Sequence, residues 1–418
     1  MTSILDNPKE YLKIFIDADD FEYERESNRY LLPNIYNSTE YNIKCDDKIL
    51  GLPNDNMGLN SKKPYLKNHS RKVSVPYLLD NETVLKQKRL FDYLSNAAAK
   101  NRVNIFFTYK PQSQRKYEVI ELTNDEMLEQ DFSGIFLRIR LSKVLEIVST
   151  DVISQYSPKL SKPFQLANVI QMDLLKSENE LEYYGVPIKA KKMMRNLLNE
   201  ILFYKFLTLN FFTKPEELQL KEVIVRNCLL ESREAIFAWL YKDECVQINS
   251  LLQRVCSRLI QNSISNGYMK KASHQFNLKC SLREYFNEEE PSMADTVENI
   301  REKLISKITN KGFQTFESDE EYYYAVGQVV NYFISLNKSK KKTHSLANPF
   351  FNTKSDKVLK DKLRGLFLKY NYDIQTFSVR FNQLYGMIEA YQPMKENLVD
   401  FMIAGYLQSN ILYLKNED

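Results

Sequence analysis

The segment DEEYYYAVGQVVNYFISL, residues 319–336, predicts a helix, and the helices predicted around it indicate the fold class. The acidic run ESDEE, residues 317–321, lies at the helix start, where carboxylates favour the positive end of the helix dipole, and we interpret it as structural. Connections are short except for residues 337–354, and antiparallel helices with short connections form a bundle. The other four helices of this predicted bundle span residues 294–309, 355–370, 374–391 and 393–414.

Composition supports a helical protein. The chain has 10 glycines and 13 prolines in 418 residues, so glycine makes up about 2.4%, against a usual share of roughly 7%. Because a sandwich or barrel needs many tight turns, this scarcity favours helices. The apolar share of 43% is enough for a sizeable core and excludes wholesale disorder. We therefore expect a mainly α protein with an α/β N-terminal domain and a C-terminal helical bundle.

Three domains are expected along the chain. Residues 1–186 show both strand and helix patterns and predict the α/β domain. Residues 187–291 predict a central helical domain, and residues 292–418 form the predicted bundle. The acidic strip EYFNEEEP, residues 284–291, marks the boundary between these two. Within the central domain, apolar residues recur at three- and four-residue intervals over residues 189–212, 214–241 and 245–265.

The N-terminal domain contains one clear helix pattern, residues 81–100, which we expect to begin with an Asn cap and to bury Val84, Phe91 and Leu94 on one face. Residues 44–76 lack sustained periodicity and predict a long loop. Alternating or apolar runs predict strands over residues 103–109, 116–122 and 134–141.

Motifs of known enzymes are missing from the sequence: it has no phosphate-binding loop, serine elbow or histidine-rich metal motif. His69, His274 and His344 are far apart, and we expect each to be a surface or hydrogen-bonded residue. The sequence therefore predicts no enzymatic activity, no catalytic residue, no cofactor and no metal. An enzyme whose site assembles only in the fold stays open as an alternative.

The pattern of cysteines and apolar runs predicts a cytoplasmic protein. No cysteine pair has zinc-knuckle spacing, and buried free thiols in a reducing cytosol are expected. The start of the chain lacks the pattern of a signal segment, and the most apolar window, residues 201–212, is too short for a membrane span. The scattered cysteines are Cys45, Cys228, Cys245, Cys256 and Cys280.

A basic loop is the first candidate nucleic-acid-binding site. The net charge is only +4, but GLNSKKPYLKNHSRK, residues 58–72, contains five cations and no acid. Lysine and arginine attract phosphates, asparagine and serine can bind base edges, and a tyrosine can stack. We expect Asn60 to contact a base edge and Lys62, Lys63 and Arg71 to contact phosphates; a solvated loop is the alternative. The candidate residues are Asn60, Ser61, Lys62, Lys63, Tyr65, Lys67, Arg71 and Lys72.

A second candidate site lies within residues 338–364. Nine positive and two negative side chains give this segment a charge of +7, which suits a cradle for a nucleic-acid backbone. A solvated helix face is again the alternative. The candidate residues here are Lys338, Lys340, Lys341, Lys342, Lys354 and Lys357.

These two regions carry a resemblance to a known family. GLPNDNMGLNSKKPYLKNHSRKVSVPYLL, residues 51–79, with FDYL at residues 91–94, resembles the N-terminal region of the large subunit of the type I-B CRISPR Cascade, an RNA-guided surveillance complex. DEEYYYAVGQVVNYFISLNKSKKKTHSLANPFF, residues 319–351, and FMIAGYL, residues 401–407, are similar to the helical bundle that ends that subunit. The likeness is weakest over residues 109–290.

The resemblance implies a non-enzymatic DNA-binding subunit. Such a subunit reads the protospacer-adjacent motif, helps to open target DNA, holds the displaced strand and recruits a helicase–nuclease, while pairing with the guide RNA reads the sequence. Its partners are target double-stranded DNA, the guide RNA and the other Cascade subunits. A metal-dependent nuclease and a protein-only structural scaffold are the alternatives from other classes.

The resemblance also implies a possible second product of the gene, because several relatives make a small subunit from an internal start. Met293 is the candidate alternative start: it follows the acidic boundary and heads a predicted helix that Asp295 and Thr296 can cap. An ordinary linker methionine is the alternative.

Overall fold

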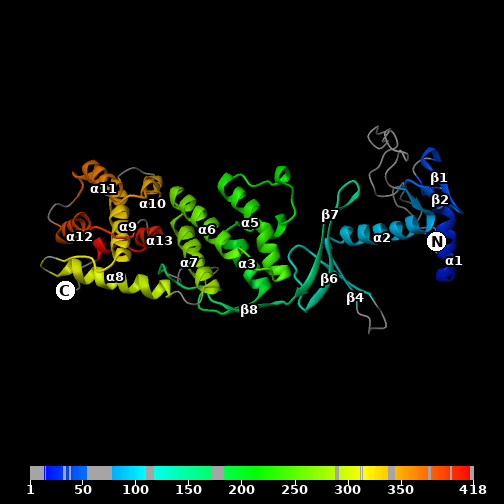
Figure 1. Ribbon diagram of the computed structural model, residues 1–418, viewed down its shortest axis with the longest axis horizontal. Coiled ribbons are helices and arrows are strands. Elements are labelled where there is room, and N and C mark those ends of the chain that lie inside the picture. Colours follow the sequence, from blue (N-terminus) through cyan, green and yellow to red (C-terminus); the bar gives the residue numbers. More distant parts are fainter. Residues whose placement is uncertain are drawn as a thin grey trace, which may run out of the picture. The chain divides into compact units, whose positions relative to one another are not determined.

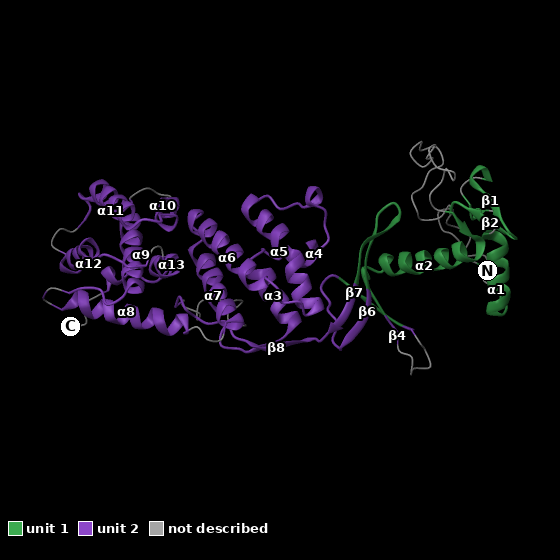
Figure 2. Cartoon of the chain, viewed as in Figure 1, with its two compact units in different colours: residues 1–107, 118–123, 136–151 green, residues 108–117, 124–135, 152–418 purple. Residues whose placement is uncertain are grey.

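In the computed structural model the chain divides into two compact units (Figure 2). Unit 1 comprises residues 1–107, 118–123 and 136–151, and unit 2 comprises residues 108–117, 124–135 and 152–418. The described residues contain thirteen α-helices, small sheets in the N-terminal part and a helical C-terminal part (Figure 1), which confirms the predicted fold class. The division into three domains stays a prediction. The structure describes residues 14, 16–31, 34–36, 39–53, 78–109, 117–171, 183–287, 291–310, 312, 314–337, 344–374, 378–395 and 398–414.

Unit 1 begins with α1 (Asp20–Leu31) and an antiparallel sheet of three short strands in the order β1-β2-β3. Residues 44–51 were expected to belong to a long loop, and this is wrong: a turn with Asp46 in the left-handed region (φ 53°) lets β1 and β2 pair. Such short strands carry no detectable periodicity. The strands are β1 (Ile43–Cys45), β2 (Lys48–Gly51) and β3 (Leu79–Asp80).

Helix α2 (Asn81–Ala99) confirms the clearest helix pattern of the N-terminal part. Its cap is Asp80 rather than the expected Asn81, because the Asp80 carboxylate accepts from Thr83 N at 3.1 Å. Val84 and Leu94 are buried as predicted, and Phe91 is partly buried against the same core. That core of unit 1 joins α2 to strands of the following sheet through Leu94, Ala97, Ile105, Ile139 and Leu145.

Four strands form one sheet in the order β5-β4-β6-β7. Three were predicted within a few residues of their bounds, because alternating burial is visible in the sequence. The fourth strand, β7, was not predicted, and neither were β8 (Lys159–Phe164) and β9 (Ile188–Ala190), which pair antiparallel. The four strands are β4 (Asn104–Tyr109), β5 (Tyr117–Leu122), β6 (Phe132–Leu141) and β7 (Leu145–Tyr156).

The following part of unit 2 is helical, as expected, but its helices differ in detail. The segment of residues 189–212 is helical as expected, but it forms two helices, because Tyr204 and Lys205 adopt left-handed conformations (φ 51° and 69°) between them. Helix α7 was missed: it is buried on nearly every side and therefore shows no amphipathic stripe. The helices are α3 (Lys191–Ile201), α4 (Leu207–Asn210), α5 (Val223–Lys242), α6 (Ile248–Ser265) and α7 (Met269–Phe286).

The C-terminal helices confirm the predicted bundle. The last predicted helix is too long: α13 ends at Leu407, and a 3-10 turn follows at Ile411–Tyr413. Helix α8 begins at Met293, which is buried, and Ser292 rather than Asp295 or Thr296 is its cap residue. The helices are α8 (Met293–Thr309), α9 (Asp319–Ser335), α10 (Asn348–Phe351), α11 (Asp356–Tyr370), α12 (Val379–Ala390) and α13 (Val399–Leu407).

Helices α9 and α13 are packed backbone to backbone. An added Cβ on Gly327 would lie 2.1 Å from the carbonyl oxygen of Met402, and one on Gly405 would lie 2.1 Å from that of Tyr324. Only glycine allows this approach. Helices α9 and α13, which are far apart in the sequence, are therefore direct packing partners.

The cysteine prediction is confirmed only in part. Cys228, Cys256 and Cys280 are buried free thiols, whereas Cys45 and Cys245 are exposed. Burial raises the pKa of Cys256 to about 12. None of the helices in the described part of the chain is long and apolar enough to span a membrane.

Candidate functional site

Most sequence-predicted site residues lie outside the described part of the chain. This applies to the whole first loop, Asn60, Ser61, Lys62, Lys63, Tyr65, Lys67, Arg71 and Lys72, and to Lys338, Lys340, Lys341 and Lys342. Lys354 and Lys357 are described. Both are exposed, just before and within the first turn of α11. Their predicted role in binding nucleic acid stays a prediction.

The neighbouring cations of α11 are engaged within the bundle. Lys360 is buried, with its Nζ 2.9 Å from Asp356 Oδ2 and donating to the Tyr391 carbonyl. Lys362 donates to the Pro349 carbonyl at 2.7 Å. Arg364 pairs with Glu389 at 2.6 Å. These three cations contact other helices of the bundle. Fewer cations of α11 are therefore free to bind a ligand than the segment charge of +7 indicates.

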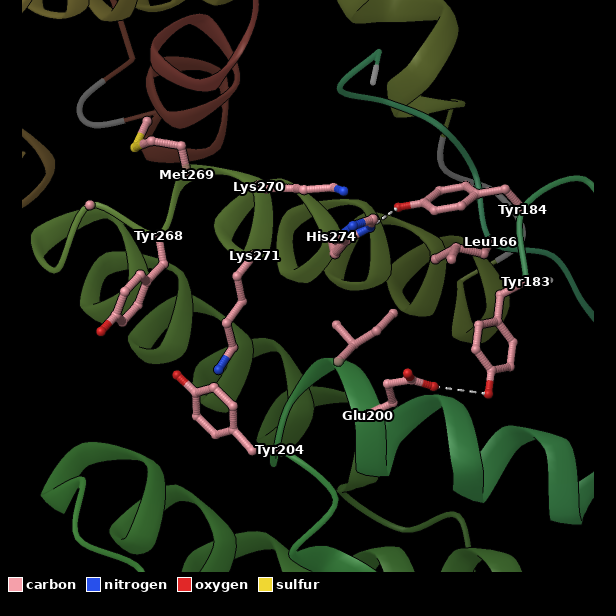
Figure 3. Close-up of a pocket in the computed structure, with 12 residues that line it drawn as sticks. Leu166, Tyr183, Tyr184, Glu200, Tyr204, Tyr268, Met269, Lys270, Lys271 and His274 are labelled. Atoms are coloured by element: carbon pink, nitrogen blue, oxygen red, sulfur yellow. Dashed lines mark hydrogen bonds between the residues drawn. The ribbon is translucent and has the colours of Figure 1, made fainter. Parts of the chain in front are cut away.

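Unit 2 contains a cavity of about 640 Å³ beside the end of α3 and the turn between α6 and α7 (Figure 3). This cavity, which we call the tyrosine pocket, was not predicted from the sequence. Its only sequence signal is the segment NGYMKK, residues 266–271, where a turn is followed by an aromatic residue and two lysines. Its lining residues are Leu166, Tyr183, Tyr184, Glu200, Ile201, Tyr204, Gly267, Tyr268, Met269, Lys270, Lys271 and His274.

Backbone conformation creates the tyrosine pocket. The left-handed residues after α3 direct the chain away from the helix axis and place the Tyr204 ring at the wall. On the other side, Gly267 has φ +77° and ends α6 sharply, so α7 begins one residue after Tyr268. The N-cap residue Tyr268 makes no side-chain cap bond. The pocket is therefore bounded by the start of an 18-residue helix.

One wall of the pocket is fixed by hydrogen bonds. His274 Nδ1 and the Tyr184 hydroxyl are hydrogen-bonded, 2.8 Å apart, which confirms that His274 is a hydrogen-bonded histidine. The buried Asn277 donates from Nδ2 to the same hydroxyl at 3.2 Å, and its Oδ1 accepts from the backbone N of Ile170 at 2.8 Å. The Tyr183 hydroxyl donates to Glu200 at 3.3 Å (Figure 3). These bonds hold the aromatic rings in defined positions.

Lys271 faces the opposite wall. Its Nζ is inaccessible to solvent, lies over the ring of Tyr204 and has no hydrogen-bond partner among the described residues. Burial lowers the pKa of Lys271 from 10.5 to about 7, because the charged form loses its hydration. A buried amine without an acceptor costs stability, and such groups are commonly found at functional sites.

We predict that Lys271→Met raises the free energy of unfolding at pH 7. The expected gain is about 1 kcal/mol, a figure discounted because the side chain is only half-buried. Since the folded-state pKa is lowered to about 7, the unfolded chain binds one proton more than the folded chain between pH 7 and about 10.4. Wild-type stability therefore rises with pH in this window relative to the variant. Urea unfolding at pH 7 and pH 10 measures the difference.

Lys192→Met is the matched control, because Lys192 is an exposed lysine on α3 that does not line the pocket. It should change neither the stability nor its pH dependence. Equal pH profiles for the two variants would contradict the assignment of a lowered pKa to Lys271.

Comparison with known proteins gives no assignment: no protein-family model, curated protein or solved structure matches the chain. In the described ranges, no group of three or more His, Cys, Asp or Glu side chains could hold a metal ion. His344 is also hydrogen-bonded, with Nδ1 2.8 Å from the Tyr406 hydroxyl, whereas His69 lies outside the described residues.

Proposed function

We propose that this chain is a non-enzymatic, nucleic-acid-binding large subunit of a type I-B Cascade-like complex in the cytoplasm. In this role it reads the motif beside the target, helps to open the DNA, holds the displaced strand and recruits a helicase–nuclease. The observation that carries the proposal is the segment of residues 58–72, which contains five cations and no acid and lies within the N-terminal stretch of family resemblance.

The C-terminal bundle supports the proposal in a second way. The segments 319–351 and 401–407 are far apart in sequence, yet helices α9 and α13 within them meet at Gly327 and Gly405. The two segments thus belong to one packed bundle. Lys354 and Lys357 lie exposed on this same unit and could contact the backbone of a displaced strand.

The proposal predicts salt-dependent binding of duplex DNA through these lysines. Each lost phosphate contact lowers the slope of log affinity against log salt by about 0.9, so Lys62→Ala/Lys63→Ala and Lys354→Ala/Lys357→Ala should each lower it by about two. A gel-shift titration of the full chain over a range of salt concentrations measures the slopes. Binding should weaken to a similar extent on different DNA sequences, because phosphates carry no sequence information.

Lys214→Ala/Lys221→Ala is the control with the same change of charge. Both lysines are exposed and lie between α4 and α5, away from the proposed surfaces in the sequence. Absence of DNA binding at low salt would favour a protein-only scaffold, and cleavage that requires a divalent metal would favour a nuclease. An equal loss of slope in all three variants would overturn the assignment to these lysines.

A further inference from the structure

We propose that the tyrosine pocket binds a nucleotide, with its base among the tyrosine rings and its phosphate beside Lys271. The proposal concerns residues of α3, α6 and α7 rather than the basic segments, and it does not rest on the proposed function. The nucleotide has two sources, a free mononucleotide or one residue of a bound strand, and the experiment below distinguishes them.

The volume of the pocket and its aromatic lining suit the base of a nucleotide. A volume of about 640 Å³ lies within the usual range of small-molecule sites, roughly 300–1,000 Å³. Leu166 and Ile201 add an apolar surface next to the rings of Tyr183 and Tyr184. Flat faces of this kind stack on any base, at about 1–3 kcal/mol per base by alanine substitution. Because Asn277 and Glu200 hold the hydroxyls of these tyrosines, little ordering is needed on binding.

The charge of the pocket favours an anion. Lys271 presents a buried amine that has no acceptor in the described structure, and Lys270 is exposed at the rim. Glu200 is the only acidic residue among the described lining residues, and it accepts from Tyr183 on the other side of the pocket (Figure 3). A phosphate oxygen would supply the missing acceptor and form a charge-assisted hydrogen bond.

The start of α7 adds to this attraction. The first backbone N–H groups of a helix have no partner within the helix, and they carry a partial positive charge. Here the helix begins at Met269, directly at the pocket, and Tyr268 provides no side-chain cap. A phosphate beside Lys271 would therefore lie near both a cation and the positive end of a helix dipole.

Binding should be coupled to proton uptake. The titratable and charged groups that line the pocket with Lys271 are Tyr183, Tyr184, Glu200, Tyr204, Tyr268, Lys270 and His274. Burial without a paired anion lowers the Lys271 pKa to about 7, so the amine is largely neutral above pH 7. A bound phosphate stabilises the charged form, and the amine takes a proton from the buffer. The destabilising amine thus becomes a favourable contact when the ligand is present.

Isothermal titration calorimetry of the full chain with deoxyadenosine 5′-monophosphate tests the proposal. At pH 8, we expect binding at least about tenfold tighter than that of deoxyadenosine or inorganic phosphate alone. Titrations in two buffers of different ionisation enthalpy should show uptake of a fraction of one proton. Lys271→Met should weaken binding at least about tenfold and abolish the proton uptake, and Tyr204→Leu should weaken binding while keeping the uptake.

Lys192→Met is again the control and should bind as the wild type does. Circular dichroism and urea unfolding check that each variant is folded, and Lys271→Met is expected to be the more stable protein. A 5′-phosphorylated deoxyadenosine hexamer distinguishes the sources. Lys271-dependent binding of the hexamer alone indicates a strand, and that of the monophosphate alone indicates a free nucleotide. If the wild type binds neither at about 1 mM, or if Lys271→Met binds as tightly as Lys192→Met, the proposal is wrong.

Discussion

Gly405→Ala is expected to destabilise the C-terminal bundle strongly, although the change adds only one methyl group. The added Cβ would lie 2.1 Å from the Tyr324 carbonyl oxygen and 2.9 Å from its carbonyl carbon. These atoms belong to the backbone of α9, so no side-chain rotation relieves the clash and the two helices must separate. Overpacking usually costs about 1–3 kcal/mol, and we expect a loss of at least about 3 kcal/mol here because the obstacle is a helix backbone.

Gly327→Ala should give a comparable loss, since its Cβ would meet the Met402 carbonyl oxygen from the other side of the same contact. Gly386→Ala in α12 and Gly365→Ala in α11 are matched controls, because at either position no described atom outside the local helix backbone lies within 4 Å of an added Cβ. Both should gain about 0.5–1 kcal/mol from the higher helix propensity of alanine. Urea unfolding followed by circular dichroism measures all four, and a stabilised Gly405→Ala protein would contradict the packing described here.

Glu321→Ala should produce the second large loss, of about 3–4 kcal/mol. The Glu321 carboxylate is 2% exposed and accepts from Lys307 Nζ at 2.8 Å and from Glu317 N at 2.8 Å. Ser318 is the N-cap residue of α9, and its Oγ accepts from the backbone N of Glu321 at 3.2 Å. Alanine would leave buried Lys307 with only the exposed Glu317 carboxylate, 3.1 Å away. The cost is that of an undercompensated buried charge.

Glu320→Ala is the matched control, one position earlier in the same acidic run. Glu320 pairs with Lys395 at 2.9 Å, and the lysine side chain is 65% exposed, so its loss should cost about 1 kcal/mol or less. The double variant Glu321→Leu/Lys307→Met should recover most of the lost stability, because apolar residues can replace a buried ion pair. Denaturant unfolding of the three proteins is the measurement. Similar losses for Glu320→Ala and Glu321→Ala would show that burial does not govern this pair.

The acidic run of residues 317–321 was predicted correctly in its local structure but not in its burial. ESDEE was interpreted as the structural start of a helix, and α9 does begin there with Ser318 as its cap. That prediction succeeded because capping and dipole effects act within one turn. The sequence could not show that the Glu321 side chain is buried against Lys307 while that of Glu320 is 25% exposed, because the difference depends on α8, which packs alongside.

In the basic segment of residues 338–364, local sequence reasoning was less successful. The sequence gives the net charge of the segment, but it does not show which cations contact the protein and which face the solvent. Lys360 and Lys362 reach the carbonyls of Tyr391 and Pro349 because long side chains can bury their stems and place the amine at a distant acceptor. Lys354 and Lys357 stay exposed. Only the packing of α10, α11 and α12 separates the two groups.

By itself the sequence determined the mainly helical class, the helices of the C-terminal bundle and the helix and strands around Leu94, because these depend on scarce glycine, local periodicity and caps. The tertiary structure decided the rest. Helix α7 has no apolar stripe because it is buried on nearly all sides, and the tyrosine pocket joins residues between 166 and 274 that no local pattern connects. The lowered pKa of Lys271 is likewise a tertiary property. It follows from desolvation by neighbours, such as Tyr204 in the turn after α3, that meet the lysine only in the folded chain.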